Sequence, residues 1–424
     1  MNAERSLWRN RDFNLLWVGQ TLSDLGGRVS GIAFPLLVLA TTGSPAKAGI
    51  VNAAGTLPLL LLTAPAGALV DRWSRKRVMI VADAARAAAL TSIVVALAFG
   101  TVSFAQIVLV ALVEGTGFVF FSVGERSALP SVVPDHHLEA ALARNQSRDY
   151  AALLGGTPLG GLLYGLARLV PFLFDAISYV VSVITLLLIR GNFSGDRGPR
   201  ERLVAEMRAG LAWFWRQRFV RTTGLLAMGS DFVVNALFLV VLVLARERGA
   251  SAALIGAMFV FLGAGGILGS LAARRLVRRF RMRTIVVATP ALVALLVPLL
   301  IVLPGRVTPG LIYGAMFFLF PAWNAAVAAR RLRLTPAELQ GRVASIAAML
   351  SLGPAFAASI VAGFLLEEAG TTPTVLVLFA LIALVALAAF LSRAVLAERE
   401  VQPDDQLAGE HSNLDEVAEL VREP

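Results

Sequence analysis

The stretch GALVDRWSRKR, residues 67–77, joins two long apolar segments and decides how the whole chain is interpreted. Residues 46–70 before it and 78–99 after it are poor in charge, whereas the join itself holds one acidic and four basic side chains. An α-helix needs about 20 apolar residues to cross a bilayer, and both segments reach that length. The stretch therefore predicts a basic turn between two membrane-spanning helices.

The composition extends this interpretation to the rest of the chain. Of its 424 residues 57% are hydrophobic and 16% are charged, and the mean hydropathy is +0.75, whereas soluble domains carry about 25% charged residues. The apolar runs are continuous, unlike the alternating segments of about ten residues in a membrane barrel. We expect an all-α membrane protein with twelve spanning helices, at 13–40, 46–70, 78–99, 103–122, 147–168, 170–190, 222–245, 252–273, 284–303, 308–329, 343–366 and 372–396. The first run is too long for a signal peptide, so we expect it to be retained.

The basic residues indicate the orientation of the chain in the membrane. The net charge is +10, and its clusters at 72–77, 190–221, 274–283 and 330–342 each follow an even-numbered run. All of them therefore fall on one side, and the positive-inside rule predicts that this side and both termini are cytoplasmic. We expect a multi-pass protein of the bacterial inner membrane. Attraction to anionic lipid head groups is a secondary effect of these clusters, and nucleic-acid binding is not expected.

The sequence offers little for catalysis or for cofactor binding. It has no cysteine, two of its three histidines are neighbours at 136–137, and the third is at 411. No G-x-x-x-x-G-K-[ST] loop is present, so ATP-driven chemistry is not indicated. We expect no enzyme, no cofactor and no metal site.

The chain reads as two related halves. Ser23–Asp24 in the first run has a counterpart at Ser230–Asp231 in the seventh, and EGTGFVFF from Glu114 resembles YGAMFFLF from Tyr313, both at an offset near 200 residues. Six plus six spans in parallel repeat is a recurrent plan of transporters. We expect an N-terminal half at 1–190, an amphipathic cytoplasmic linker at 191–221, a C-terminal half at 222–396 and an acidic cytoplasmic tail at 397–424.

Residues 67–77 resemble the loop signature of the major facilitator superfamily, Gly-x-x-x-Asp-(Arg/Lys)-x-Gly-x-(Arg/Lys)-(Arg/Lys). Five positions match and Ser74 replaces a glycine; in the second half, Ala273 replaces the aspartate. The resemblance implies that the motif latches the two halves in the outward-facing state, with the glycine allowing close helix approach. With a nearby charged pair, the expected latch residues are Gly67, Asp71, Arg72, Lys76, Arg77, Asp83 and Arg86.

Within that superfamily the chain resembles the twelve-span drug:proton antiporters, which include macrolide and siderophore exporters. The resemblance rests on LWRNRDFNLLWVGQTLSDLGGRVSGIAFPLLVLATTGS, DAARA at 83–87, ALPSVVPDHHLEAALARNQS at 128–147 and LQGRVASI at 339–346. The fifth run contains an approximate antiporter motif at Gly156, Pro158, Gly160 and Gly161, with Thr157 at the usual proline position. Ordinary packing of small residues is the alternative explanation. The arginine that many antiporters carry in the fourth span is replaced by Ala111.

Ionisable side chains within the apolar runs are candidates for proton coupling, because a charge at mid-bilayer depth is costly and usually functional. Burial favours a neutral carboxyl at position 24, whereas Arg28, four residues on, favours its charged form. We expect the two to form a titratable pair that faces a central cavity. The coupling candidates are Asp24, Arg28, Glu114 and Asp231, with Asp175 a weaker one. For Asp83 and Arg86 an internal salt bridge that fixes helix rotation is the alternative.

Amide and aromatic side chains in the runs are candidates for a substrate cavity, although packing and lipid contact explain many such residues. The candidates are Asn52, Phe120, Phe121, Asn235, Phe317, Trp323 and Asn324.

The resemblance implies a secondary transporter, expected to be a monomer, that exports a small amphipathic compound in exchange for protons by alternating access. A siderophore exporter, a lysolipid flippase, a nutrient importer and a non-transporting membrane scaffold are the alternatives, because the fold does not set the function.

Overall fold

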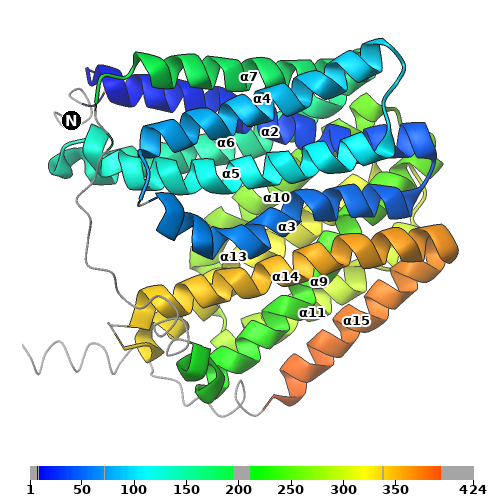
Figure 1. Ribbon diagram of the computed structural model, residues 1–424. Helices are drawn as coiled ribbons and strands as arrows, with labels where there is room; N and C mark the ends of the chain where they lie inside the picture. Colours follow the sequence, from blue (N-terminus) through cyan, green and yellow to red (C-terminus); the bar gives the residue numbers. More distant parts are fainter. Residues whose placement is uncertain are drawn as a thin grey trace, which may run out of the picture.

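The computed structural model describes residues 7, 9–70, 72–191, 193, 211–336 and 339–392, and this part of the chain is helical without any strand. Its helices pack side by side in one bundle (Figure 1). In chain order they are α2 (Arg11–Thr42), α3 (Pro45–Val70), α4 (Arg75–Ala98), α5 (Phe104–Val132), η1 (Asp135–His137), α6 (Leu138–Leu166), α7 (Val170–Leu188), α9 (Arg218–Glu247), α10 (Ala252–Arg279), α11 (Met282–Leu296), α12 (Leu299–Val302), α13 (Thr308–Leu334), α14 (Gln340–Glu368) and α15 (Thr371–Leu391).

Eleven helical segments of the described chain are long and apolar enough to cross a membrane. They coincide with eleven of the predicted runs, and α11 with α12 form one of them. The remaining run, 147–168, is the apolar part of α6, whose first turns carry Glu139, Arg144, Arg148 and Asp149. The expected all-α membrane protein is therefore confirmed, while the twelfth span stays a prediction.

The bundle has two ends, a basic end and an opposite end. The basic end is where α3 gives way to α4, at Arg72 and Arg77. The opposite end is where α2 gives way to α3. There Gly43 closes α2 in the left-handed conformation, with φ 71°, and its N–H donates to the carbonyl of Leu39. A glycine in this conformation satisfies the last carbonyl groups of a helix and lets the chain reverse, so Pro45 begins α3 only two residues later.

Glycine contacts join two helices in the same way within α2–α7 and within α9–α15. A Cβ on Gly115 of α5 would lie 3.1 Å from the carbonyl carbon of Gly55 on α3. A Cβ on Gly265 of α10 would lie 2.9 Å from the carbonyl carbon of Gly314 on α13. Because Gly115 and Gly314 are the positions matched by the sequence repeat, the contacts follow the pattern that an internal repeat predicts.

Helices α2–α7 contact α9–α15 mainly along two seams, α6 against α10 and α3 against α14. Both seams have close backbone approaches near the opposite end. A Cβ on Gly161 would lie 2.7 Å from the backbone nitrogen of Gly256, and one on Gly363 would lie 3.2 Å from the Cα of Gly49. At the same end, Glu367 of α14 accepts hydrogen bonds from the Ser44 hydroxyl and, at 3.0 Å, from the backbone N–H of Ala46.

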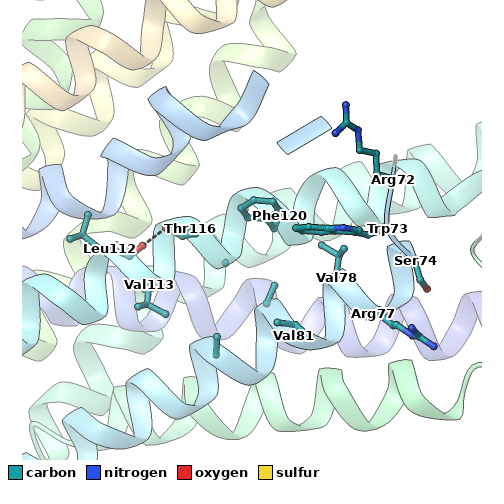
Figure 2. A pocket seen from close by; sticks show the side chains of 13 residues that line it. Arg72, Trp73, Ser74, Arg77, Val78, Val81, Leu112, Val113, Thr116 and Phe120 are labelled. Carbon is teal, nitrogen blue, oxygen red and sulfur yellow. Dashed lines mark hydrogen bonds between the residues drawn. The ribbon is translucent and has the colours of Figure 1, made fainter. Parts of the chain in front are cut away.

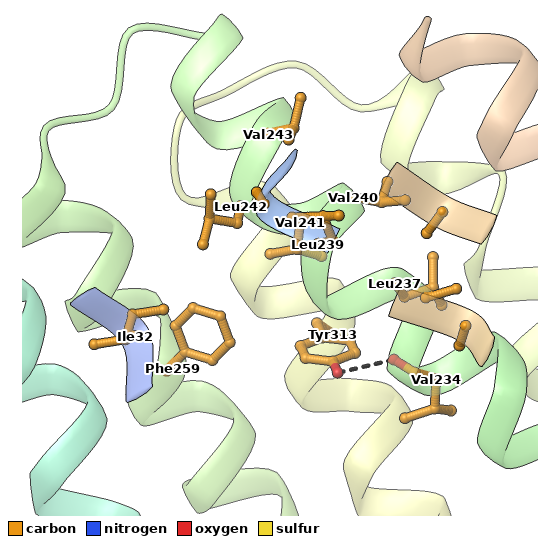
Figure 3. Packing of buried hydrophobic residues seen from close by; sticks show 14 of the residues in the cluster. Ile32, Val234, Leu237, Leu239, Val240, Val241, Leu242, Val243, Phe259 and Tyr313 are labelled. Carbon is orange, nitrogen blue, oxygen red and sulfur yellow. Dashed lines mark hydrogen bonds between the residues drawn. The ribbon is translucent and has the colours of Figure 1, made fainter. Parts of the chain in front are cut away.

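A large apolar core extends from α2 into the helices of α9–α15. Figure 3 shows Ile32 of α2 near Phe259 of α10, with the buried run of α9 alongside. The hydroxyl of Tyr313 on α13 is buried in this core and donates to the carbonyl of Val234 on α9 over 3.0 Å, which satisfies the polar end of the ring.

Two predicted segments fall wholly or partly beyond this description. Residues 192 and 194–210 of the expected linker and all of the expected tail at 397–424 lie outside the described residues.

Candidate functional site

Arg148 of α6 binds three carboxylates from three helices. Its Nε lies 2.7 Å from Oδ2 of Asp24 on α2, and its Nη1 lies 2.7 Å from Oε1 of Glu125 on α5. Its Nη2 reaches Asp149, the next residue, at 3.2 Å. The side chain of Arg148 is only 5% exposed, whereas those of Asp24 and Asp149 are 26% and 52% exposed. We call these four residues the Arg148 cluster; it joins α2, α5 and α6 and is partly open to its surroundings.

This arrangement differs from the predicted Asp24–Arg28 pair. The ion pair that Asp24 forms among the described residues is with Arg148, and the stem of Arg28 instead packs against α6 near Gly156. Arg28 is four residues from Asp24, but an arginine from another helix approaches the carboxylate more closely, and no sequence spacing reports such a contact.

Glu125 and Arg148 were missed because both lie at the edges of their predicted runs. The fourth run was expected to end at residue 122 and the fifth to begin at 147, but α5 continues to Val132 and α6 already begins at Leu138. One signal in the sequence could have found them: the two residues carry opposite charges and lie on either side of a short connection between helices.

A second charged cluster is sealed between α4, α5 and α7. The Nη1 of Arg86 lies 3.3 Å from Asp83 Oδ1, and its Nε lies 3.3 Å from Glu114 Oε2. The hydroxyl of Tyr179 donates to the same Glu114 oxygen over 2.8 Å, and the guanidinium lies over its ring, 4.0 Å from the centroid. The Asp83 side chain is 0% and that of Glu114 12% exposed. We call these four residues the Arg86 cluster.

The predicted internal salt bridge between Asp83 and Arg86 is present, and it also includes Glu114. Oε1 of Glu114 is buried and has no hydrogen-bond partner among the described residues. Asp175 of α7 is fully buried close by, and the hydroxyl of Ser178 donates to its Oδ1 over 3.1 Å. Among the described residues Arg86 forms ion pairs with Asp83 and Glu114 but not with Asp175, so ionisation of all three carboxyl groups would leave net negative charge in an apolar interior.

Gly26 and Gly27 give the Arg86 cluster its room. Helix α2 continues through them without a break. A Cβ on Gly26 would lie 3.1 Å from the Cα of Asp175, and one on Gly27 would lie 3.5 Å from the Tyr179 hydroxyl oxygen. The glycine pair thus lets α7 approach α2 closely, one turn beyond Asp24.

A pocket of about 460 Å³ lies among α9, α11, α13 and α14. Its wall includes five of the predicted residues, contributed by α9 and α13: Asp231, Asn235, Phe317, Trp323 and Asn324. Tyr313, Phe320, Arg331 and Ser351 were not predicted and line it as well. The amide of Asn235 donates to the backbone carbonyl of Asp231 over 2.7 Å. The ring faces and the Asp231 carboxylate attract the positive charge of an amphipathic cation, whereas Arg331, two turns beyond Asn324 on α13, adds one positive charge to the same pocket.

The other three cavity candidates lie elsewhere. Phe120 lines a groove between α4 and α5, and Phe121 is 4% exposed in a core cluster with Met79 and Leu186. The amide of Asn52 donates to the hydroxyl of Ser359 over 2.7 Å and so belongs to the α3–α14 seam. Aromatic character alone does not separate a cavity wall from a helix contact.

The latch motif is described in part. Asp71 lies outside the described residues. The Nζ of Lys76 donates to the carbonyl of Ile189 over 2.7 Å and so contacts the residue that follows α7, whereas Arg72 and Arg77 are exposed. The close helix approach expected at Gly67 is not found, because no described atom lies within 4 Å of a Cβ built there.

The glycines of the fifth run are packing positions. Cβ atoms on Gly156 and Gly160 would meet the backbone of α2, at 3.1 Å from the Leu25 carbonyl oxygen and 3.0 Å from the Cα of Val29. Gly161 faces α10 instead, and Pro158 lies within α6. Packing of small residues, the alternative weighed above, is thus realised at these three glycines.

Long apolar helices, a pocket among α9, α11, α13 and α14, and buried ionisable groups on α2 and α4–α7 are typical of a membrane transporter. The chain belongs to the transmembrane secretion effector family of the major facilitator superfamily, whose family model matches residues 5–423. The resemblance stated from the loop signature is therefore confirmed.

Two curated relatives carry names that describe efflux. The chain is 28% identical to the multidrug efflux pump Tap of Mycobacterium tuberculosis over 385 aligned residues. The alignment covers 86% of this chain and 89% of that protein. It is 25% identical over 232 residues to macrolide efflux protein A of Streptococcus pyogenes, over 53% of this chain and 57% of that one.

Solved structures share the fold at low sequence identity. A bacterial homolog of the human lysosomal transporter Spinster, in an inward-facing and unoccupied conformation, gives a TM-score of 0.71 at 15% identity, over 93% of this chain and 99% of that one. A bacterial homologue of the iron transporter ferroportin in the inward-facing state gives 0.70 at 17% identity, over 90% and 98%. These likenesses show the fold alone.

Proposed function

We propose that this protein is a proton-coupled exporter of small amphipathic compounds, with a preference for cations. The observation that carries the proposal is the pocket beside Asp231, where aromatic side chains and one carboxylate meet in a space of about 460 Å³. A pocket of a few hundred Å³ is in the size range of small-molecule sites. The names of the Tap and macrolide efflux relatives support the outward direction and the substrate class.

The two charged clusters supply the groups for proton coupling. Each has one arginine and an excess of carboxyl groups, and an unpaired carboxylate in an apolar interior is costly, so each favours holding a proton. In the Arg148 cluster, Asp24 is the accessible member. In the Arg86 cluster, a proton can bind the unpartnered Oε1 of Glu114 without breaking the contacts of Oε2. Arg28 remains a candidate that acts through the charge it adds near Asp24.

The two seams support the proposal of alternating access. The glycine approaches and the Glu367 contacts tie the halves near the opposite end, and their release would open that end. The inward-facing state of two solved relatives of the fold supports assigning the basic end to the open, cytoplasmic side. We propose that the latch residues at 67–77, with Asp71, act when the basic end closes.

The organisation proposed with this mechanism has twelve spans, α6 being the fifth, in halves at 1–190 and 222–396 joined by the linker at 191–221 and followed by the tail at 397–424. Both termini are cytoplasmic, the membrane is the bacterial inner membrane, and the transporter is a monomer. The positions of the basic clusters support this orientation.

The test is accumulation of a fluorescent cationic dye in efflux-deficient bacteria, with and without a protonophore. Cells that express the protein should hold less dye, and the protonophore and the Asp24→Asn substitution should each abolish that difference. Asp149→Asn is the matched control, because Asp149 contacts the same arginine but is 52% exposed; it should retain export. Dye levels equal to the empty vector, with the protein in the membrane, would overturn broad cation export.

A further inference from the structure

A groove of about 750 Å³ lies between α4 and α5 (Figure 2), and it shares no lining residue with the pocket or with either charged cluster. Val78, Val81 and Ala85 of α4 form one wall, and Val113, Thr116 and Phe120 of α5 form the other. The hydroxyl of Thr116 donates to the carbonyl of Leu112 over 2.7 Å, so it is already satisfied within its own helix. The walls are therefore apolar in effect.

The groove faces the surroundings of the bundle. Val81 is 66% exposed, and Leu109, on the same side of α5, is 61% exposed. The opposite face of α4 carries Asp83 and Arg86 into the interior. In a helix bundle that spans a membrane, an outward face of this kind contacts lipid.

Positive charge is concentrated at one end of this groove. Arg72 and Arg77 line its mouth at the basic end, and both are exposed. Among the described residues neither has an acidic partner within 4.0 Å. Trp73 lies between them in sequence, also at the mouth, and is 57% exposed, which is typical of a ring at the membrane–water interface.

The depth of the groove suits a chain that enters from this mouth. Ala85 is eight residues beyond Arg77 on α4, so the apolar wall extends roughly 12 Å into the membrane at 1.5 Å per residue. A cationic mouth with an apolar channel beneath it complements a molecule that has an anionic head and an apolar tail.

We propose that the groove binds an anionic phospholipid from the leaflet that faces the basic end. Its phosphate contacts Arg72 and Arg77, for which the guanidinium fork is well matched, and one acyl chain lies between α4 and α5. The site is separate from the proposed substrate pocket, so it stands whether or not the chain exports cations. Each arginine near an anionic lipid surface favours binding by about fivefold, so the pair should give a preference of an order of magnitude or more over a zwitterionic lipid.

The fluorescence of Trp73 reports the occupant directly. The purified full-length protein in detergent micelles is titrated with brominated phosphatidylglycerol or brominated phosphatidylcholine, and the Trp73 signal is the difference between wild type and Trp73→Phe. We expect brominated phosphatidylglycerol to quench this signal at a mole fraction at least about tenfold lower than brominated phosphatidylcholine requires. Arg72→Gln/Arg77→Gln should remove the preference. Ala85→Phe should fill the groove and weaken quenching by both lipids while both arginines remain.

Arg278→Gln/Arg279→Gln is the matched control, because these two arginines are also exposed at the end of a helix with a basic last turn. It should leave the preference unchanged. Equal quenching by the two lipids, or an equal loss in the control, would overturn the proposal. Displacement by water-soluble glycerol phosphate, together with full quenching in Ala85→Phe, would overturn it in favour of a site for a free anion.

Discussion

The guanidinium of Arg148 lies 2.7 Å from the carboxylate of Asp24, on a different helix and 124 positions away in the sequence. The same guanidinium contacts Glu125 through two nitrogens, at 2.7 and 3.4 Å. Arg148 thus joins α2, α5 and α6, and among the described residues it is the ion-pair partner of all three acids in the cluster.

This shared ion-pair partner predicts a specific pattern of stability. Arg148→Gln leaves two largely buried carboxylates unpaired and should lower the free energy of unfolding by about 3 kcal/mol, the lower end of the range for a broken buried pair because Asp24 is partly exposed. The double variant Glu125→Gln/Arg148→Gln should recover at least about 1 kcal/mol, since one stranded charge is gone. Denaturant unfolding in detergent measures both.

The neighbouring Arg126 provides the control for this measurement. It is exposed on α5, so Arg126→Gln should change stability by no more than about 0.5 kcal/mol. Strictly additive effects of the Glu125 and Arg148 substitutions would mean that the two side chains do not support each other in the folded protein.

The second prediction concerns Glu114. Glu114→Gln keeps a carbonyl oxygen that can accept from Tyr179 but removes the titratable oxygen, so the protein should still bind and exchange substrate while losing transport driven by a proton gradient. In proteoliposomes, counterflow of dye should remain within about twofold, and accumulation driven by a pH difference should fall by about tenfold or more, a change of about 1.4 kcal/mol.

Glu139→Gln is the matched control, because Glu139 is an exposed acid in the first turn of α6. It should preserve both activities. Gradient-driven accumulation that survives Glu114→Gln would assign coupling to the Arg148 cluster instead.

The fold was predictable because a bilayer imposes a length and a polarity on every span. Continuous apolar runs and one-sided basic clusters were sufficient to place eleven helices, and α6 was also found as a run although polar residues occupy its first turns. The helix ends were less accurate: α5 and α6 extend by nine or ten residues beyond their apolar runs.

The site was predictable only where a single helix determines it. Asp231 and Asn235, both candidates from the sequence, are one turn apart on α9 and line the same pocket. The partner of Asp24 depends on how α6 packs against α2, and the partners of Glu114 depend on α4 and α7. Such contacts are fixed by tertiary packing, so the local Asp24–Arg28 spacing indicated the wrong partner.

The third prediction tests the substrate pocket. Asp231→Asn should weaken binding of a cationic dye by about tenfold, or about 1.4 kcal/mol, because the aromatic wall then acts without its carboxylate. Binding of a neutral compound of similar shape should be unchanged. Quenching of Trp323 fluorescence, isolated by subtraction of a Trp323→Phe variant, measures both ligands. Equal weakening for the neutral compound would indicate that the substitution deforms the pocket and that Asp231 has no selective role.

The last prediction concerns closure of the opposite end, where Gly161 of α6 meets Gly256 of α10 backbone to backbone. Gly161→Ala should hinder this approach at a cost of about 1–3 kcal/mol and shift the protein towards a form that is open at that end. Lys47 and Glu368 are both exposed at that end, and spin labels can be attached there through Lys47→Cys and Glu368→Cys. The chain has no cysteine, so no native cysteine has to be replaced first. We expect Gly161→Ala to raise the share of long distances between the labels by about fivefold or more.

Gly155→Ala is the control on the same helix, because a Cβ there would meet only a leucine methyl group at 3.9 Å. The same shift in both variants would mean that the change comes from α6 itself, and no shift in either would mean that this glycine contact does not hold the end closed.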